Sequence, residues 1–428
     1  MKYRNIAFLS VFFLFFGNYS HLTSQSNPKL YLHFVTHNEE NDVFLTNYSY
    51  YILNRNNIIQ LANTVVSKNV KWNFQSDHAF LRAVIKYDTG STTNNTNGKN
   101  IIRWLVEDMG VTCDPHAHET SYNYADVAHL HDSLGITATK VVGGFLYDTI
   151  VNGNNWENLE AGIYGRQYPW VFWKPDILWG GGTQNHFADP QVYGAFKPKS
   201  MAEYWVHDPA RRLTLIGNGC GNKIWDTSSV GYIFGKIKRI TDAIDAHSLP
   251  DTGFYTAAIF ISSGSLTTTV INKFSQVVDS INSLVGQNKV EWKEISAAKQ
   301  IWDSVYNRQP FWIKCENLPP LGIEQISNSI PSQFTLYQNY PNPFNPETII
   351  NYELRVTSYV QLKIFNVLGE EVTALVNEEL RPGTYEVSWP ACRSCSAGRD
   401  ASDYSSGVYY YKLISKEYTE TRKMVLIK

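Results

Sequence analysis

The sequence predicts an α/β fold, an irregular seven-stranded (β/α) barrel, followed by a small all-β, immunoglobulin-like sandwich. Strand-like and helix-like runs alternate from residue 30 to residue 306, and the helical period of apolar residues disappears after residue 331. Such alternation indicates a parallel sheet with helices outside it, whereas short alternating runs between turns indicate a sandwich. With 428 residues, the chain is also long enough that two domains are the natural expectation.

The first region contains seven segments with the apolar pattern of strands. We expect these strands within Leu30–Thr36, Val70–Asp77, Gly110–Glu119, Lys140–Tyr147, Lys174–Gly180, Arg212–Asn218 and Phe254–Ile261. Helical spacing predicts helices over Ser49–Lys68, His78–Lys86, Ile101–Met109, Tyr124–Leu134, Tyr232–His247, Thr267–Leu284 and Ile295–Tyr306. The stretch from Asp88 to Lys99 is rich in Thr, Asn and Gly, which predicts a surface loop.

The first residues have the composition of an export signal. Lys2 and Arg4 precede the apolar run Ile6–Phe16, and a polar stretch of small residues follows. This pattern predicts a signal peptide over residues 1–24. No later segment has 18 uninterrupted apolar residues, so we expect an exported chain without a transmembrane segment.

The net charge, the aromatic residues and the cysteines limit which classes of function the sequence favours. The formal net charge of −2 provides no basic field and argues against a nucleic-acid partner. Aromatic residues make up 14% of the chain, as is typical of extracellular proteins that handle carbohydrate and of secreted β-rich proteins. Five scattered cysteines do not predict a disulfide framework. Cys392 and Cys395 are close in sequence and are expected to form a loop disulfide or to remain two free thiols.

A histidine pair ends the third expected strand. His116 and His118 are two residues apart, so strand alternation places both imidazoles on one face, together with Asp114. Imidazole is the commonest nitrogen ligand of Zn²⁺, which takes about three or four such groups. The pair therefore predicts a site for a divalent metal, with zinc as the expected ion. The alternative is a histidine pair that is hydrogen-bonded at the start of a loop.

A second polar cluster ends the first expected strand. It contains His37, Glu39, Glu40 and Asp42. Two histidines alone hold Zn²⁺ poorly, so a third protein ligand from Glu39, His37 or Asp42 is required, with water in an open position. Strands that end in ligand-type residues are what a barrel with a metal at its strand tips requires.

Residues 27–316 resemble the polysaccharide deacetylase, or NodB-like, superfamily. The resemblance rests on the acidic cluster after the first strand, the two-histidine motif, and the ending Val290–Trp302. It implies an incomplete seven-stranded barrel in which Glu39 or Asp42, His116 and His118 bind the metal. It also implies that Glu40 or Asp114 acts as the general base.

Four further residues are candidates for the cleft. His186 is a possible general acid, although a single histidine in an aromatic loop is more often structural. Asp77, at the tip of the second strand, is expected to line the cleft or to cap the helix that follows. Trp173 and Trp179 are expected either to stack on sugar rings or to pack in the core.

The second region reads as strands after a linker. Residues 317–332 contain Pro319 and Pro320, lack apolar periodicity and predict a linker. Short alternating runs then predict strands over Thr348–Leu354, Val360–Phe365, Gly383–Trp389, Gly407–Ile414 and Thr421–Ile427.

Residues 333–428 closely resemble the C-terminal sorting domain of type IX secretion. The motifs are Leu336–Pro346, Asn366–Gly369, Ser406–Tyr409 and the basic end of the chain. The resemblance implies that the type IX machinery is a partner and that the cargo is secreted or held at the cell surface.

Together these features favour an exported, metal-dependent hydrolase that acts on extracellular polysaccharide by deacetylation. Two alternatives remain open at this point. One is a glycoside hydrolase of the related barrel families, which needs two catalytic carboxylates about 5–9.5 Å apart. The other is a non-catalytic surface protein that binds glycan.

Overall fold

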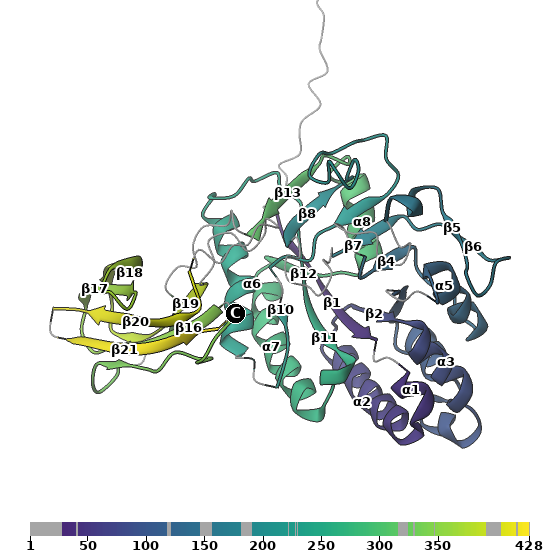
Figure 1. Ribbon diagram of the computed structural model, residues 1–428, viewed down its shortest axis with the longest axis horizontal. Helices are drawn as coiled ribbons and strands as arrows, with labels where there is room; N and C mark the ends of the chain where they lie inside the picture. Colours follow the sequence, from purple (N-terminus) through teal and green to yellow (C-terminus); the bar gives the residue numbers. More distant parts are fainter. Residues whose placement is uncertain are drawn as a thin grey trace, which may run out of the picture.

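The computed structural model describes residues 28–39, 42–117, 121–145, 156–180, 191–220, 222–226, 228, 230–315, 324–327, 330–345, 347–390, 404–416 and 418–427. Strands and helices mix up to residue 315, and the elements described after it are all strands. Figure 1 shows this second region as a group of arrows at the yellow end of the colour scale. The predicted signal peptide and the cysteines Cys392 and Cys395 lie outside the described residues.

The first sheet of the mixed region is parallel throughout. Its order is β10-β11-β1-β2-β3, and β12 also pairs with the first residues of β1. The bounds are β1 Leu30–Asn38, β2 Trp72–Ser76, β3 Thr112–Pro115, β10 Asn222–Lys223, β11 Tyr255–Ser262 and β12 Val290–Trp292. All nine residues of β1 except His37 are buried, as expected of a strand that is covered on both faces.

The second sheet has the order β13-β8-β9-β7-β4. Its parallel strands are β4 (Val141–Gly143), β7 (Ile177–Trp179) and β9 (Thr214–Ile216), and its antiparallel strands are β8 (Val192–Phe196) and β13 (Phe311–Lys314). Backbone contacts join the two sheets at two places, between the ends of β3 and β4 and between β11 and the segment after β9. His116 forms a parallel bridge to Gly143, and the backbone N–H of Ala258 donates to the carbonyl of Asn218 over 2.9 Å.

The seven strands expected in this region are present at their expected positions, as β1, β2, β3, β4, β7, β9 and β11. The expected helices are present as α2 (Tyr48–Ser67), α3 (His78–Tyr87), α4 (Ile101–Glu107), α5 (Tyr124–Ser133), α6 (Val230–Asp245), α7 (Thr268–Gly286) and α8 (Ile295–Ser304), with a short α1 (Val43–Thr46) before them. Side-chain caps stabilise the starts of several helices. For example, the side chain of Asn47 accepts a hydrogen bond from the backbone N–H of Tyr50, and that of Thr267 accepts one from the N–H of Val270. None of the described helices has both the length and the apolar content needed to cross a bilayer.

The strands separate two apolar clusters. The larger cluster packs the helices against the outer faces of the strands, and it includes Leu32 and Phe34 of β1. The smaller cluster contains Tyr31 and Val35 of the same strand, together with Trp302 of α8. Alternate residues of β1 therefore face opposite clusters, and α8 packs on the inner one. Asn73, near the start of β2, accepts a hydrogen bond from the N–H of Ile295 at the beginning of α8.

The expected surface loop from Asp88 to Lys99 is more ordered than its composition suggests. Gly90–Thr96 form a 3-10 helix, and Asp88 is buried. The Nε atom of Arg55 on α2 donates to Asp88 over 2.9 Å, and both side chains are almost fully buried. The segment lies at the surface as predicted, but it forms regular structure because Asp88 and Thr96 bind the buried guanidinium of Arg55.

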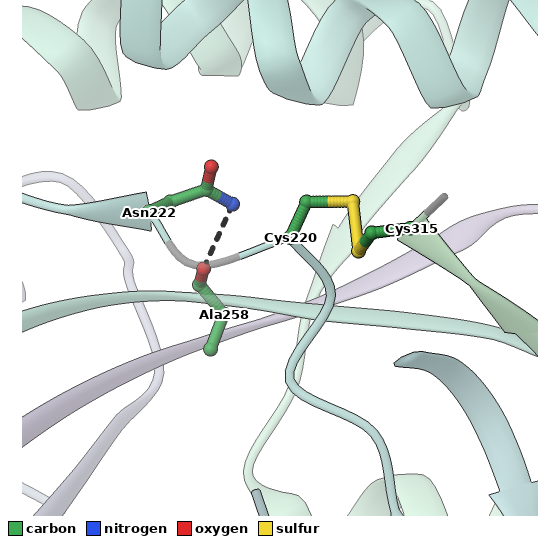
Figure 2. The surroundings of a disulfide bond; sticks show 4 residues. All are labelled: Cys220, Asn222, Ala258 and Cys315. Atoms are coloured by element: carbon green, nitrogen blue, oxygen red, sulfur yellow. Dashed lines mark hydrogen bonds between the residues drawn. A yellow bond between two sulfur atoms is a disulfide. The ribbon is translucent and has the colours of Figure 1, made fainter. Parts of the chain in front are cut away.

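A disulfide joins Cys220, just before β10, to Cys315, at the end of β13, with the Cα atoms 5.5 Å apart (Figure 2). Next to it, Asn222 donates to the carbonyl of Ala258 over 3.0 Å. The sequence analysis did not predict this disulfide, because the two cysteines are 95 residues apart and do not belong to a recognisable cysteine pattern. Cys113 of β3 is a free, buried cysteine.

Two antiparallel, four-stranded sheets form the C-terminal region. Their orders are β14-β19-β16-β15 and β18-β17-β20-β21, and residues from both sheets share one apolar cluster. The bounds are β14 Glu324–Ser327, β15 Thr335–Leu336, β16 Glu347–Leu354, β17 Ser358–Phe365, β18 Glu371–Leu380, β19 Gly383–Pro390, β20 Gly407–Ile414 and β21 Thr419–Leu426. All five expected strands are present, and β18 was missed. The strand β14 lies inside the stretch expected to be linker and pairs with β19.

A buried histidine on α5 predicts a pH effect on stability. The Nδ1 atom of His131 lies 2.9 Å from the carbonyl oxygen of Val127, and burial lowers the pKa of His131 from 6.5 to about 4. Between these values the unfolded chain binds a proton that the folded chain does not, so the free energy of unfolding decreases as the pH falls. The slope from this one group reaches about 1.4 kcal/mol per pH unit.

We expect His131→Gln to remove this contribution, so that the free energy of unfolding of the variant depends less steeply on pH between 6.5 and 4. Urea unfolding at several pH values measures the slopes. His129→Gln, at a partly exposed position of the same helix, is the matched control. Equal slopes for His131→Gln and the wild type would contradict the prediction.

Candidate metal centre at the strand ends

Two histidines and a glutamate meet at the carboxyl ends of β1 and β3. His37 is the penultimate residue of β1, Glu39 follows the strand, and His116 follows β3. Each offers one ligand atom, and these atoms all lie within 4.8 Å of one another. The carboxyl ends of parallel strands lie at the same edge of a sheet, so residues 77 positions apart in sequence come together.

Glu39 lies between the two imidazoles. Its Oε2 atom is 2.6 Å from Nε2 of His116, and its Oε1 atom is 3.7 Å from Nδ1 of His37. The two rings are 4.8 Å apart between centroids. The His116 side chain is fully buried, whereas 28% of the Glu39 side chain is exposed. The cluster is therefore closed beneath and open to solvent on the glutamate side.

The surroundings favour the ligating forms of these groups. Burial lowers the pKa of His37, which favours the neutral imidazole. Burial by itself would raise the pKa of Glu39. The charge interactions and hydrogen bonds of its carboxylate with His116 and His37 outweigh burial and hold that pKa well below its ordinary value. A neutral imidazole beside a charged carboxylate is the combination that binds divalent metals.

Aromatic rings and two glycines shape the space around the imidazoles. Trp179 of β7 meets His37 edge-on at 5.9 Å, and the Phe260 ring of β11 lies 5.3 Å from it. A Cβ atom built on Gly144 would lie only 2.2 Å from Cε1 of His116, so the glycine makes room for the ring. The sequence contains a signal for this contact, because paired glycines at the end of a strand often mark a close approach by another group.

The donor set fits zinc. Two imidazoles and a carboxylate are a known ligand combination for this ion, and metal binding would replace the hydrogen bond between Glu39 and His116. The buried Nε2 atom of His37 has no hydrogen-bond partner among the described residues. Buried polar atoms rarely remain unsatisfied, so this nitrogen is consistent with an absent ligand.

Asp114, one of the two expected bases, lies deeper in the sheet. Its side chain is fully buried and accepts hydrogen bonds from Asn73 over 2.9 Å, Gln75 over 3.3 Å and Thr139 over 2.5 Å. Burial raises the pKa of Asp114 to about 6, while these three bonds act in the opposite direction. Because both oxygens are already bonded and neither is exposed, this position supports a structural role and not that of a base.

Of the other expected site residues, Asp77 lies beside the cluster, because its backbone N–H donates to the carbonyl of Asn38 over 3.1 Å, and some lie outside the described residues. Asp77 caps α3 by accepting from the N–H of Phe80 over 3.0 Å, and Asp42 is an exposed residue at the start of α1. Trp173 is buried against Tyr124, so of its two expected roles the structure favours packing in the core. Trp179 is also buried, although it contacts His37. The residues outside the described part are Glu40, His118 and His186.

Comparison with known protein families decides the nature of the C-terminal region. Residues 338–428 match the family described as the secretion system C-terminal sorting domain. This region is a type IX sorting domain. The sorting domain implies an interaction with the type IX machinery, and it indicates export of the chain to the cell surface or the extracellular space.

Outside the sorting domain the comparisons are distant. An allantoinase structure matches with 10% identity and a TM-score of 0.41, over 65% of this chain and 91% of that one. A probable polysaccharide deacetylase from Pseudomonas aeruginosa PAO1 matches with 13% identity and a TM-score of 0.40, over 66% of this chain and 92% of that one. A 4-alpha-glucanotransferase from Thermococcus litoralis matches with 10% identity and a TM-score of 0.35, over 64% of this chain and 40% of that one. No curated protein matches the chain.

Proposed function

We propose that the chain is an exported, metal-dependent hydrolase that removes acetyl groups from extracellular polysaccharide. The observation that carries this proposal is the convergence of His37, Glu39 and His116 at the carboxyl ends of two parallel strands. In α/β folds ligands bind outside these strand ends. The sorting domain supports an extracellular substrate, because the chain is exported.

The architecture proposed for this function is an irregular seven-stranded barrel with its site at the strand tips. The parallel strands β1, β2, β3, β4, β7, β9 and β11 support it, together with the backbone contacts that join the two sheets. For the sorting domain, the two antiparallel sheets that share one apolar cluster support an immunoglobulin-like sandwich.

In the proposed site, His37, Glu39 and His116 hold a divalent ion, zinc by preference, and His118 is a further candidate ligand. When bound, such an ion polarises an acyl carbonyl and lowers the pKa of water. Glu39 brings negative charge to the site, and the buried ring of Trp179 and the partly buried ring of Phe260 limit the access of water from one side. Of the two candidate bases, the buried position of Asp114 favours Glu40, which the sequence places directly after Glu39.

Elemental analysis of the purified full chain tests the proposal. We expect close to one equivalent of zinc after reloading, and at least a 100-fold loss of zinc affinity in His37→Ala and His116→Ala. The loss of an actual ligand should exceed the 10–100-fold cost of losing a supporting group. His247→Ala is the matched control, because this histidine is exposed and lies after α6, outside the cluster.

Acetate release from acetylated chitin oligosaccharides is the second measurement, and we expect it to disappear together with the metal. If the folded wild type holds no zinc, cobalt or manganese after reloading, the hydrolase proposal is wrong. Metal binding without acetate release would keep the metal site and reject deacetylation as the reaction.

A further inference from the structure

A short hairpin outside the metal centre displays three aromatic rings to solvent. Its strands are β5 (Ile163–Tyr164) and β6 (Phe172–Trp173), which pair antiparallel. Trp170 is 72% exposed, Tyr164 64% and Phe172 50%. The rings of Tyr164 and Phe172 lie 5.1 Å apart. Exposed rings are common singly, but three within nine residues of one hairpin need an explanation.

The turn of the hairpin is held rigidly by one buried carboxylate. Asp126 of α5 is fully buried and accepts from the backbone N–H groups of Arg166, Gln167 and Tyr168 over 2.9–3.0 Å. It also accepts from the N–H of Asn123 over 2.9 Å. Four hydrogen bonds to one charged group fix the turn on the start of α5, so the exposed rings are presented in a set arrangement.

The rings themselves pack on neighbours that limit their movement. Trp170 lies 5.7 Å from the ring of Tyr168 in a T-shaped arrangement, and Tyr168 in turn lies 4.4 Å from the ring of His129. The Phe172 ring fills the space beside Gly162, where a Cβ atom would lie 2.4 Å from it. Fixed rings lose little conformational entropy when a ligand covers them.

The hairpin is tied to the segment that follows the metal-binding histidine. Gln167 Nε2 donates to the carbonyl of Ser121 over 2.9 Å, and Asn123 Nδ2 donates to the carbonyl of Tyr164 over 2.8 Å. Ser121 is only five residues after His116, a length of chain that spans at most about 18 Å.

We propose that the β5–β6 hairpin is a platform that binds extracellular glycan by stacking sugar rings on Trp170, Tyr164 and Phe172. In β-1,4-linked hexoses the equatorial hydroxyl groups leave flat C–H faces, which are complementary to aromatic faces. The large exposed hydrophobic residues of the hairpin are all aromatic, so each offers a flat face to a sugar ring, and the export of the chain brings this surface to extracellular glycan. The platform extends the proposed function and rests on it for the class of ligand, but binding by the rings does not need the metal.

Fluorescence titration of the full chain with chitohexaose and with cellohexaose tests this inference, with affinity electrophoresis in glycol chitin as a second measurement. We expect saturable binding of at least one hexasaccharide by the wild type. Trp170→Ala should weaken that binding roughly tenfold or more, as the loss of an aromatic anchor commonly does. Tyr164→Ala combined with Phe172→Ala should weaken it similarly, and Trp170→Phe should retain most of it.

Tyr48→Ala is the matched control, because Tyr48 is 50% exposed on α2, outside the hairpin. We expect this variant to bind as the wild type does. If neither sugar binds to the wild type, or if Trp170→Ala and the double variant bind with unchanged affinity, the hairpin is not a glycan platform.

Two crossed measurements separate this inference from the metal centre. His116→Ala should lose zinc and still bind the hexasaccharide, whereas Trp170→Ala should keep zinc and lose the sugar. Sugar binding by a wild-type chain that takes up no metal after reloading would support the platform and reject the hydrolase. Zinc binding by a wild type whose sugar affinity does not depend on the three rings would support the metal centre and reject the platform.

Discussion

Replacing Gly144 by alanine is expected to disrupt the proposed metal centre without changing any of its proposed ligands. A Cβ atom at this position would lie 2.2 Å from Cε1, 2.8 Å from Nδ1 and 2.9 Å from Nε2 of His116. Cβ atoms do not approach other heavy atoms this closely, and the fully buried imidazole has little space into which it can move. We therefore expect zinc affinity to fall at least 100-fold, which competition with a chromogenic chelator measures.

Gly110→Ala is the matched control for this experiment. Gly110 has a φ of +68° and Gly144 a φ of +64°, so both substitutions place an L side chain in the left-handed region. A Cβ atom on Gly110, however, meets nothing within 4 Å. The control should lose about 1–2 kcal/mol of stability from backbone strain and keep its zinc affinity. Similar zinc affinities in the two variants would show that His116 is not held against Gly144.

Removing the disulfide is expected to have the largest effect on stability. Cys220 and Cys315 enclose a segment with a sequence separation of 95 residues. The loop-entropy model assigns about 4–5 kcal/mol to a loop of this length, and native disulfides typically contribute about 2–5 kcal/mol. We expect Cys220→Ser combined with Cys315→Ser to lower Tm on the order of 10 °C, as measured by differential scanning calorimetry.

Reductant provides an independent check of that result. Dithiothreitol should lower Tm of the wild type to nearly the value of the double variant, and it should leave the double variant unchanged. Cys113→Ser should keep the full response to reductant, because Cys113 is free. If the double variant has the same Tm as the wild type under oxidising conditions, the disulfide contributes nothing to stability.

The alternation of apolar residues in the sequence was sufficient to predict most strands and helices of the first region. Each of the seven expected strands is present at or next to its expected range, and so is each expected helix. The physical reason is that these elements bury a face, so their periods of about 2 and 3.6 residues are written in the order of the residues. Short strands without a period, such as β5, β6 and β8, were not predictable in this way.

Parts of the candidate site were also predictable. The residues of the cluster, His37, Glu39 and His116, were all candidates, because ligand-type side chains at strand ends are visible in a sequence. The choice among the acidic residues was not visible. The structure places Asp42 at the start of α1 and buries Asp114 under three hydrogen bonds, and both facts depend on neighbours that are distant in sequence.

The sequence by itself determined the periodic elements, the ligand-type residues at the strand ends and the sorting domain, since each of these is encoded in residues close together along the chain. Only the tertiary structure decided which tryptophans are exposed: Trp173 and Trp179 are buried, whereas Trp170 is open to solvent. It also decided that Cys220 meets Cys315 and that Gly144 makes room for His116. Burial and contact depend on which segments pack together, and pairing between distant segments leaves no period in the sequence.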